Sequence, residues 1–354
     1  MAKQKRRVGH NLAPAAAKQA APAPAAQSSQ PSAQAAAALA EKAAVDALLN
    51  QLEAARSRPA IVYWITQAAK VSTAVELTLA DQLMALPSNA ELDLVLYTFG
   101  GDTEAPARIV DLIREYTTHL TVLVPHLALS SGTLIALGAD EIQMTPLGTL
   151  GPIDPSRAHP LLPRKTDADD PEPVSVQDMQ HAMQFIKDAV GPDVKPSSEA
   201  WAQIITSLFD KVHPLAIGAI EQSYALAKLI ARHNIETHMD KISAEKQITA
   251  IIDKLCDGYK SHGYRISRKE AGEIGLNVVN PTPTVETILF QLVKHYLARP
   301  IAPGLTGQPK KGSKVITHIA WMDSVRQKYR CEQTSLVKDA AGTLQSISDG
   351  WKAY

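Results

Sequence analysis

The chain has 354 residues, 45% of them hydrophobic and 20% charged, and its formal net charge is +0 at pH 7. A chain of this length can bury a substantial core, and the balanced charge argues against a nucleic-acid partner. The two cysteines, Cys256 and Cys331, lack CxxC spacing, so neither a disulfide framework nor a metal site is predicted.

Residues 1–37 consist mainly of Ala, Pro, Gln and Ser. Such a segment cannot bury enough surface to offset its chain entropy, so we expect a disordered tail. Its basic stretch, Lys3 to Arg7, is not followed by an apolar run, and a secretory signal is therefore not expected. No segment reaches the ~18–20 apolar residues that a membrane span requires. We expect a cytoplasmic protein without a membrane span.

A lead-in segment, residues 38–58, follows the tail. Over residues 38–56, alanines and leucines recur at helical spacing, which predicts an amphipathic helix that leads into the folded domain or contacts another copy. Residues 61–65 are a short β-prone run, and residues 73–86 have a helical pattern. Residues 92–97 are almost continuously apolar, as in a strand of a parallel sheet that is covered on both faces.

Strands and helices continue to alternate along the next part of the chain. A helix with Pro106 near its first turn is followed by a strand over 120–124, a short helix over 131–137 and a strand over 141–144. This alternation predicts an α/β fold with a largely parallel sheet.

The second half of the chain is predicted to be mostly helical. Residues 160–173 are rich in proline and charge, which predicts a mobile loop. Residues 267–279 predict a helix feeding a last strand, and residues 300–354 have mixed patterning that supports no assignment. The other helical patterns cover residues 176–190, 200–209, 216–233, 244–262 and 284–297.

Gly100 and Gly101 directly follow a predicted strand. Glycine lets a backbone N–H face a pocket without interference from a Cβ, and paired N–H donors can hold an oxyanion or a phosphate. The spacing does not match a dinucleotide fingerprint or a P-loop, so no cofactor is predicted. A plain tight turn is the alternative interpretation.

Ser130 stands where the strand over 120–124 gives way to the helix over 131–137. At that place its hydroxyl can be exposed at the start of the helix, while the amide of Ser131 supplies a second oxyanion donor. The alternative is that Ser130 only caps the helix.

The stretch from Pro59 to Ser156 resembles the Clp-fold serine peptidases, and most closely the serine dehydrogenase proteinase family. The matching runs are Asp93–Asp102, Val124–Leu137, Ala139–Met144 and Leu150–Pro155, with a further match from His262 to Val278. An unmatched insert covers about residues 160–255. The resemblance implies a Clp/crotonase-like α/β fold, a parallel β-sheet spiral with flanking helices. Its catalytic domain would cover residues 59–299, with residues 300–354 as an extension.

The same resemblance implies the site residues of a serine peptidase. The nucleophile falls on Ser130 and not on Ser131. The oxyanion donors fall on the Gly100–Gly101 turn and on the Ser131 amide.

The general base is not at the position that the family pattern implies. A serine hydroxyl needs a partner that takes its proton, and the histidine position of the Clp peptidases falls on Ile153, beside Asp154. The neighbourhood of their acidic residue holds His262 instead. We therefore predict that histidine and carboxylate have exchanged places, giving Ser130, His262 and Asp154. The alternative interpretation makes Asp154 a turn residue and His262 a solvated loop residue.

Other bases stay open. In the related signal peptide peptidase A enzymes a lysine from a later helix is the base, but its position falls on Gln177. Lys165, Lys187 and His126 are the remaining candidates.

Three functions are compatible with these motifs. The first is a serine peptidase acting on peptide or protein substrates. The second is a crotonase-like acyl hydrolase, and the third is a catalytically silent oligomeric scaffold. The resemblance also implies a homo-oligomer, a trimer or a hexamer.

Overall fold

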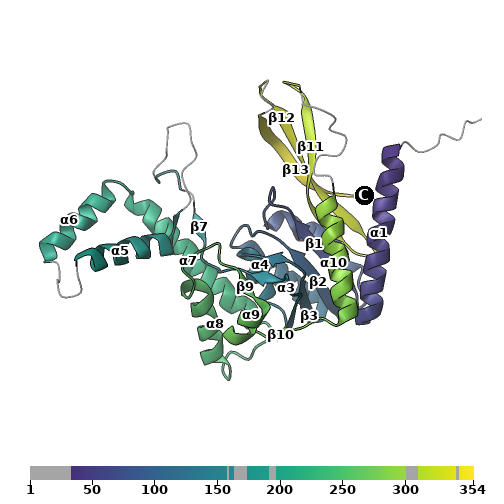
Figure 1. Ribbon diagram of the computed structural model, residues 1–354, viewed down its shortest axis with the longest axis horizontal. Helices are drawn as coiled ribbons and strands as arrows, with labels where there is room; N and C mark the ends of the chain where they lie inside the picture. The colour runs from purple at the N-terminus through teal and green to yellow at the C-terminus, as the bar shows by residue number, and fades with distance from the viewer. Residues whose placement is uncertain (1–32, 158, 163–173, 191–196, 300–309, 340–342) are drawn as a thin grey trace, which may run out of the picture. The chain divides into compact units, whose positions relative to one another are not determined.

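The computed structural model describes residues 33–157, 159–162, 174–190, 197–299, 310–339 and 343–354 (Figure 1). Most of the predicted tail, most of the predicted loop 160–173, and Lys165 lie outside the described residues. Residues 43–354 form one compact unit. Helix α1 (Ala33–Arg56) begins at Ala33 rather than at Ala38.

Parallel strands form one half of the main sheet. Nearly every residue of β1 (Ala60–Ile65) and β2 (Ala90–Tyr97) is buried, which explains their continuous apolar runs. The α/β prediction is thus confirmed for this part of the chain. In spatial order the parallel strands are β10 (Val278–Val279), β5 (Glu141–Met144), β3 (Thr117–Val124), β2 (Ala90–Tyr97) and β1 (Ala60–Ile65).

The other half of the sheet comes from the C-terminal region, for which the sequence supported no assignment. Strand β11 (Lys314–Asp323) pairs antiparallel with β1, and Trp321 lies opposite Trp64. Strands β12 (Lys328–Val337) and β13 (Leu344–Ala353) continue the sheet as antiparallel neighbours. The sheet therefore joins residues 60–144 to residues 314–353 in one layer.

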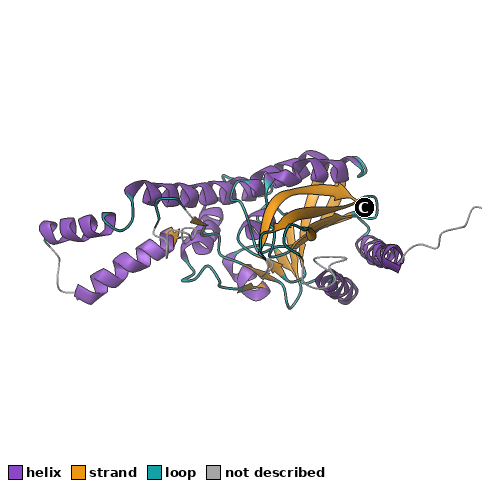
Figure 2. Cartoon of the chain, turned by 90° about the horizontal axis from the view of Figure 1, so that it is seen from above, coloured by secondary structure: helices purple, strands orange, loops and turns teal. Residues whose placement is uncertain are grey.

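Helices cover both faces of the sheet (Figure 2). Side chains alternate along β1, so Ile61 and Tyr63 belong to one core and Val62 and Trp64 to the other. The first core also contains residues of α2 (Glu76–Met84), α3 (Ala105–Tyr116), α4 (Ser131–Ala136), α7 (Pro214–Ile235), α8 (Glu245–Asp257) and α9 (Arg268–Ile274). The second contains residues of α1 and α10 (Pro283–Ala298).

A small second sheet brings three distant segments together. Its strands are β4 (Leu127–Ala128), β6 (Thr149–Leu150) and β9 (Ile266–Ser267), in that order. Strand β4 comes just before Ser130, β6 just before Asp154, and β9 just after His262. This sheet therefore gathers the segments that carry the predicted site residues. A separate pair is formed by β7 (Ser156–Arg157) and β8 (Val174–Ser175).

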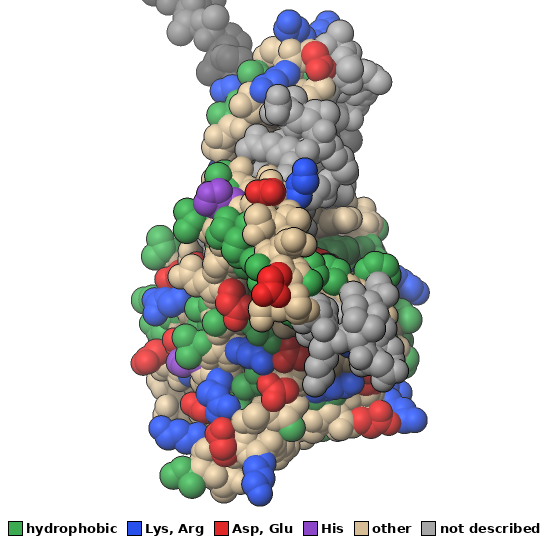
Figure 3. All heavy atoms as spheres, turned by 90° about the vertical axis from the view of Figure 1, so that its left-hand side faces the viewer, with side chains coloured by type: hydrophobic (Ala, Val, Ile, Leu, Met, Phe, Trp, Pro, Cys, Tyr) green, Lys and Arg blue, Asp and Glu red, His purple; other side chains and the backbone are tan. Residues whose placement is uncertain are grey.

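The predicted insert is largely helical. Helices α5 (Val176–Val190) and α6 (Ser198–Phe209) confirm two of the predictions, and they lie on the side shown in Figure 3, where hydrophobic side chains are exposed among charged ones. Phe185 is 73% exposed and Leu215, at the start of α7, is 67% exposed. The predicted helix over 244–262 is wrong at its end, because α8 stops at Asp257. The next residue is Gly258, a poor helix former.

Three properties bear on the kind of protein. Both cysteines are buried and free. In the parts of the chain that the structure describes, no three His, Cys, Asp or Glu side chains group as metal ligands. None of the described helices is both long and apolar enough to cross a membrane.

A buried carboxylate holds the C-terminal strands to α10. Asp323 accepts hydrogen bonds from the hydroxyls of Tyr296, at 2.6 Å, and Tyr354, at 2.8 Å, and Arg299 lies 3.3 Å away. Burial raises the pKa of Asp323, while Arg299 opposes that rise.

Replacing Asp323 with alanine should therefore cost about 3–5 kcal/mol of unfolding free energy, because a buried arginine then loses its carboxylate. Urea denaturation measures this. Glu273→Gln is the control, since Glu273 belongs to an exposed 3.8 Å pair with Lys269 that contributes little. Equal midpoints for the two variants would contradict the role given to Asp323.

Candidate active site

Ser130 has a strained backbone. Its φ is 50° and its ψ −112°, a conformation that residues with a Cβ rarely adopt. The residue directly precedes α4, yet its side chain makes no capping hydrogen bond to that helix. The capping interpretation therefore has no support in the geometry. A serine held in a strained turn between a strand and a helix is instead typical of a nucleophile whose hydroxyl must be exposed.

The Gly100–Gly101 turn lies against Ser130. Gly100 has a φ of 112°, which only glycine adopts readily, and a Cβ on it would lie 2.9 Å from the Ser130 Cβ. Its N–H donates to the Thr98 hydroxyl at 3.0 Å. Of the two glycine amides, that of Gly100 is therefore already engaged, which leaves Gly101 as the better oxyanion donor.

The neighbouring ladder orients Gly101. The N–H of Val71 donates to the Gly100 carbonyl at 3.0 Å, and the N–H of Asp102 donates to the Val71 carbonyl at 2.8 Å. These two hydrogen bonds involve the carbonyl of Gly100 and the N–H of Asp102. The N–H and the carbonyl of Gly101, which lie between them, therefore point away from Val71. On that other side the Ser131 hydroxyl lies 2.9 Å from the Gly101 carbonyl. The N–H of Gly101 thus faces the start of α4.

Ser131 is buried, and its hydroxyl bridges the Gly101 and Asp102 carbonyls at 2.9 and 3.1 Å. Its side chain fixes the glycine turn to α4. That leaves its amide, at the first turn of α4, as the predicted second oxyanion donor.

His262 and Asp154 lie side by side. His262 Nδ1 is 3.0 Å from Asp154 Oδ1, and the Asp154 side chain is only 3% exposed while that of His262 is 46% exposed. The N–H of Ile153 donates to the Leu255 carbonyl at 3.1 Å, which anchors the segment before Asp154 to the end of α8. The two residues are 108 positions apart in the sequence.

The hydrogen bond to Asp154 raises the pKa of His262 above its usual 6.5, against the lowering effect of burial. It also selects a tautomer: when Nδ1 donates to the carboxylate, Nε2 carries the free lone pair of a base. This arrangement is the one that a serine hydrolase requires of its histidine.

A pocket of about 260 Å³ joins these parts. Ser130, Gly100, Gly101 and His262 all line it. The remaining lining residues are Gln67, Ala69, Lys70, Phe99, Thr103, Pro155 and Ser156.

The alternative bases are differently placed. His126 does not line this pocket, and it lies beside Tyr97 with ring centroids 5.9 Å apart. Burial lowers the pKa of His126. Lys165 lies outside the described residues, as does the side chain of Lys187. Gln177 is buried and donates to the Cys256 carbonyl.

Two residues near the site were missed by the sequence analysis. Thr98 holds the Gly100 amide, and Lys70 lines the pocket. Thr98 directly precedes the Phe99-Gly100-Gly101 turn, which was the available signal. Lys70 lies in a loop without any recognisable motif.

Replacing Gly101 with alanine should reduce activity by about 10²–10³-fold, as loss of one oxyanion donor does. The new Cβ would lie 2.3 Å from both the N and the O of Val71, so the turn must move and its N–H with it. The rate at which a fluorophosphonate labels the protein measures this. Gly218→Ala is the control, because a Cβ there meets nothing within 4 Å in α7. Equal labelling rates for both variants would remove Gly101 from the site.

Fold and site together define a class. A sheet with parallel strands flanked by helices, in which a serine at the start of a helix faces a glycine turn, is a Clp/crotonase-like α/β fold. Residues 72–170 match the model of a family described as ClpP-like SDH-type serine proteinase. This match confirms the resemblance seen in the sequence.

Comparison with individual proteins gives similarity over only part of the chain. The chain is 26% identical over 212 residues to an uncharacterized protein of Methanocaldococcus jannaschii, covering 60% of this chain and 62% of the relative. A second uncharacterized protein of that organism is 42% identical over 69 residues, covering 20% of this chain and 24% of its own length. Among solved structures, a mutant of the membrane-bound stomatin-specific protease 1510-N is similar to this chain at 15% sequence identity. The match covers 65% of this chain and 82% of the protease chain. The TM-score of 0.33 is too low to bear on the fold.

Proposed function

We propose that the protein is a serine peptidase that cleaves peptide bonds through an acyl-enzyme, with Ser130 as nucleophile. The observation that carries the proposal is the strained backbone of Ser130 beside the Gly100–Gly101 turn, in a pocket that His262 also lines. Backbone strain of this kind costs of order 1–3 kcal/mol and is found mainly where function requires it.

In the proposed reaction His262 Nε2 takes the proton of the Ser130 hydroxyl as its oxygen attacks the scissile carbonyl carbon. Asp154 accepts a hydrogen bond from Nδ1–H and stabilises the imidazolium. The amides of Gly101 and Ser131 stabilise the negative oxygen of the tetrahedral intermediate. His262 then gives its proton to the leaving amine, which leaves an acyl ester on Ser130. A water molecule, activated by the same imidazole, hydrolyses that ester.

The contact between His262 and Asp154 supports this exchanged order of histidine and carboxylate. The oxyanion donors act on any carbonyl, so an acyl hydrolase is the second candidate function.

A fluorophosphonate probe followed by peptide mass mapping tests the proposal. Labelling of the wild-type chain at Ser130, with cleavage of casein or of quenched peptides, is the expected result. Hydrolysis of acyl-CoA esters without cleavage of any peptide would instead show an acyl hydrolase. A chain that is neither labelled nor active on either substrate would be a silent scaffold, and the proposal would be wrong.

A homo-oligomer, trimeric or hexameric, and a cytoplasmic location are also part of the proposal. Both come from the sequence and the family resemblance. Light scattering at micromolar concentration tests the first, and a monomer mass would contradict it. Cell fractionation tests the second.

A further inference from the structure

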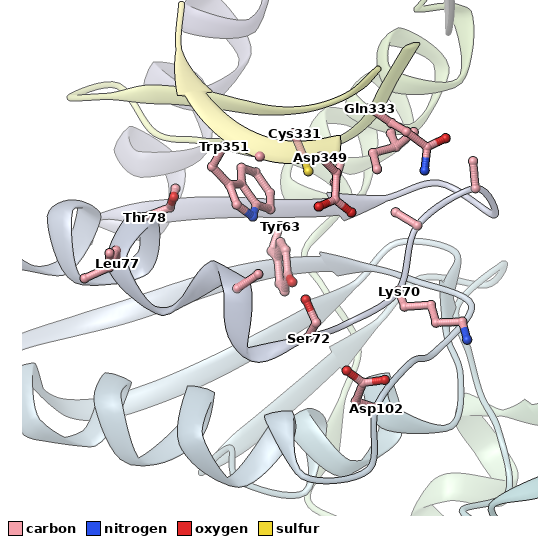
Figure 4. Close-up of a pocket in the computed structure, with 16 residues that line it drawn as sticks. Tyr63, Lys70, Ser72, Leu77, Thr78, Asp102, Cys331, Gln333, Asp349 and Trp351 are labelled. Atoms are coloured by element: carbon pink, nitrogen blue, oxygen red, sulfur yellow. The ribbon is translucent and has the colours of Figure 1, made fainter. Parts of the chain in front are cut away.

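A second cavity, of about 560 Å³, lies next to the predicted active site (Figure 4). We call it the Trp351 pocket. Its walls come from two distant parts of the chain, because Tyr63 of β1 and the loop with Lys70 and Ser72 face Asp349 and Trp351 of β13. Its size falls within the range that small ligands and side chains occupy.

The Trp351 pocket adjoins the pocket of about 260 Å³ described above, which we call the Ser130 pocket. Ala69 and Lys70 line both cavities. Gly101 lines the Ser130 pocket, while the next residue, Asp102, lines the Trp351 pocket. A peptide whose carbonyl lies at Ser130 is therefore within reach of the Trp351 pocket through one of its side chains.

The Tyr63 hydroxyl is a further polar group of the Trp351 pocket. Tyr63 as a whole is only 2% exposed, but its hydroxyl is not among the buried polar atoms that lack a partner, so it is open to the cavity. No residue that the structure describes forms a hydrogen bond with it. The Tyr63 hydroxyl oxygen can therefore accept a hydrogen bond from a group that enters the cavity.

The charge of the Trp351 pocket is mainly negative. Asp102 and Asp349 contribute two carboxylates, against one lysine, Lys70. The described ion pairs leave both carboxylates without a basic partner, whereas Glu332 on the adjacent strand pairs with Arg330 and Lys352. Both carboxylates are exposed to solvent, and a cationic group that entered the cavity would complement their charge.

The rings of the Trp351 pocket suit the stem of a long side chain. Trp351 and Tyr63 have centroids 6.2 Å apart and are tilted by 47°. Aliphatic stems pack against aromatic faces while their charged ends reach polar groups, and guanidinium groups also favour such faces.

We propose that the Trp351 pocket is a specificity subsite that takes a lysine or arginine side chain of the peptide substrate, with the Asp349 carboxylate as its counter-ion and the Tyr63 hydroxyl as a further acceptor. The proposal rests on the proposed function in that it assigns the substrate to the Ser130 site.

Binding is measured first, with the full chain carrying Ser130→Ala so that no peptide is consumed. Two fluorescent peptides are compared, identical except that one has arginine where the other has citrulline, a neutral analogue of the same shape. The substituted position is moved along the peptide to find the best register. The arginine peptide should bind at least about tenfold more tightly, as expected for charge-assisted hydrogen bonds.

Adding Asp349→Asn should reduce this ratio to near one, and Tyr63→Phe should lower it severalfold. Asp349 lies on an exposed part of β13, so its replacement should not disturb folding. Glu115→Gln is the matched control, an exposed carboxylate that lines neither pocket, and it should leave the ratio unchanged. Equal binding of the two peptides, or a ratio that Asp349→Asn does not change, would overturn the proposal.

Turnover by the wild-type chain separates this proposal from the proposed function. Arginine-selective binding without cleavage or labelling at Ser130 would leave the subsite standing and remove the peptidase. Cleavage of both peptides with equal kcat/KM would do the reverse.

Discussion

Ser130→Ala is expected to abolish peptide hydrolysis and fluorophosphonate labelling while changing the unfolding free energy by about 1 kcal/mol or less. The stability change is small because the Ser130 side chain makes no capping hydrogen bond whose loss would weaken α4. Hydrolysis is lost because the attacking oxygen is removed. Labelling, quenched-peptide assays and urea denaturation measure the three quantities on the same preparation.

Two companion variants sharpen this prediction. Ser130→Gly should be equally inactive but more stable than Ser130→Ala, because glycine adopts a φ of 50° without strain. Ser131→Ala should retain measurable activity, since only its amide is required, but it should lose stability because its hydroxyl bridges two carbonyls. An inactive Ser131→Ala beside an active Ser130→Ala would show that the nucleophile is assigned one residue too early.

His262→Ala is expected to reduce turnover by several orders of magnitude, since a serine without its base is a weak nucleophile. Asp154→Asn should reduce it by about 10⁴-fold, the loss that follows when the histidine is held in the wrong tautomer. Both effects should appear in kcat more than in KM, because the two side chains act on the proton and not on substrate binding.

The pH profile distinguishes a catalytic histidine from a merely structural one. The base must be neutral, so activity should rise with pH through the pKa of His262, and the midpoint should lie above 6.5 because Asp154 raises that pKa. In Asp154→Asn the hydrogen bond to the carboxylate is lost, so the midpoint of the residual activity should move to lower pH. Near wild-type rates for both variants would exclude the exchanged pair and leave Lys165, Lys187 and His126 to be tested.

The sequence predicted the parallel part of the fold because buried strands are readable locally. The apolar run over 92–97 lies within β2, and the predicted strand over 141–144 coincides with β5. Strands β11 to β13 were not predicted because their exposure alternates irregularly and their pairing has a bulge between His318 and Ala320. These strands are ordered by the pairing of β11 with β1, and a local sequence pattern cannot predict a pairing between such distant segments.

The candidate site was predictable to a similar degree. Ser130 and the glycine turn belong to short motifs, whereas Asp154 and His262 were paired only by noting where the chain departs from the Clp pattern. The hydrogen bond from the Gly100 N–H to the Thr98 hydroxyl oxygen depends on how the Thr98 side chain is oriented, which the sequence does not specify. The Trp351 pocket could not be predicted, because one of its walls lies in residues 300–354, for which the sequence supported no secondary-structure assignment.

The position of β1 has a consequence for how the protein is made. One edge of β1 pairs with β2, which follows within a few dozen residues, but the other pairs with β11, about 260 positions later. A ribosome must therefore synthesise nearly the whole chain before that edge is covered, and until then an apolar strand is open to pairing with other nascent chains. Such distant contacts also slow folding. The same order of synthesis means that the Ser130 segment emerges long before β13, so substrate selection through the Trp351 pocket would arise only in the finished protein.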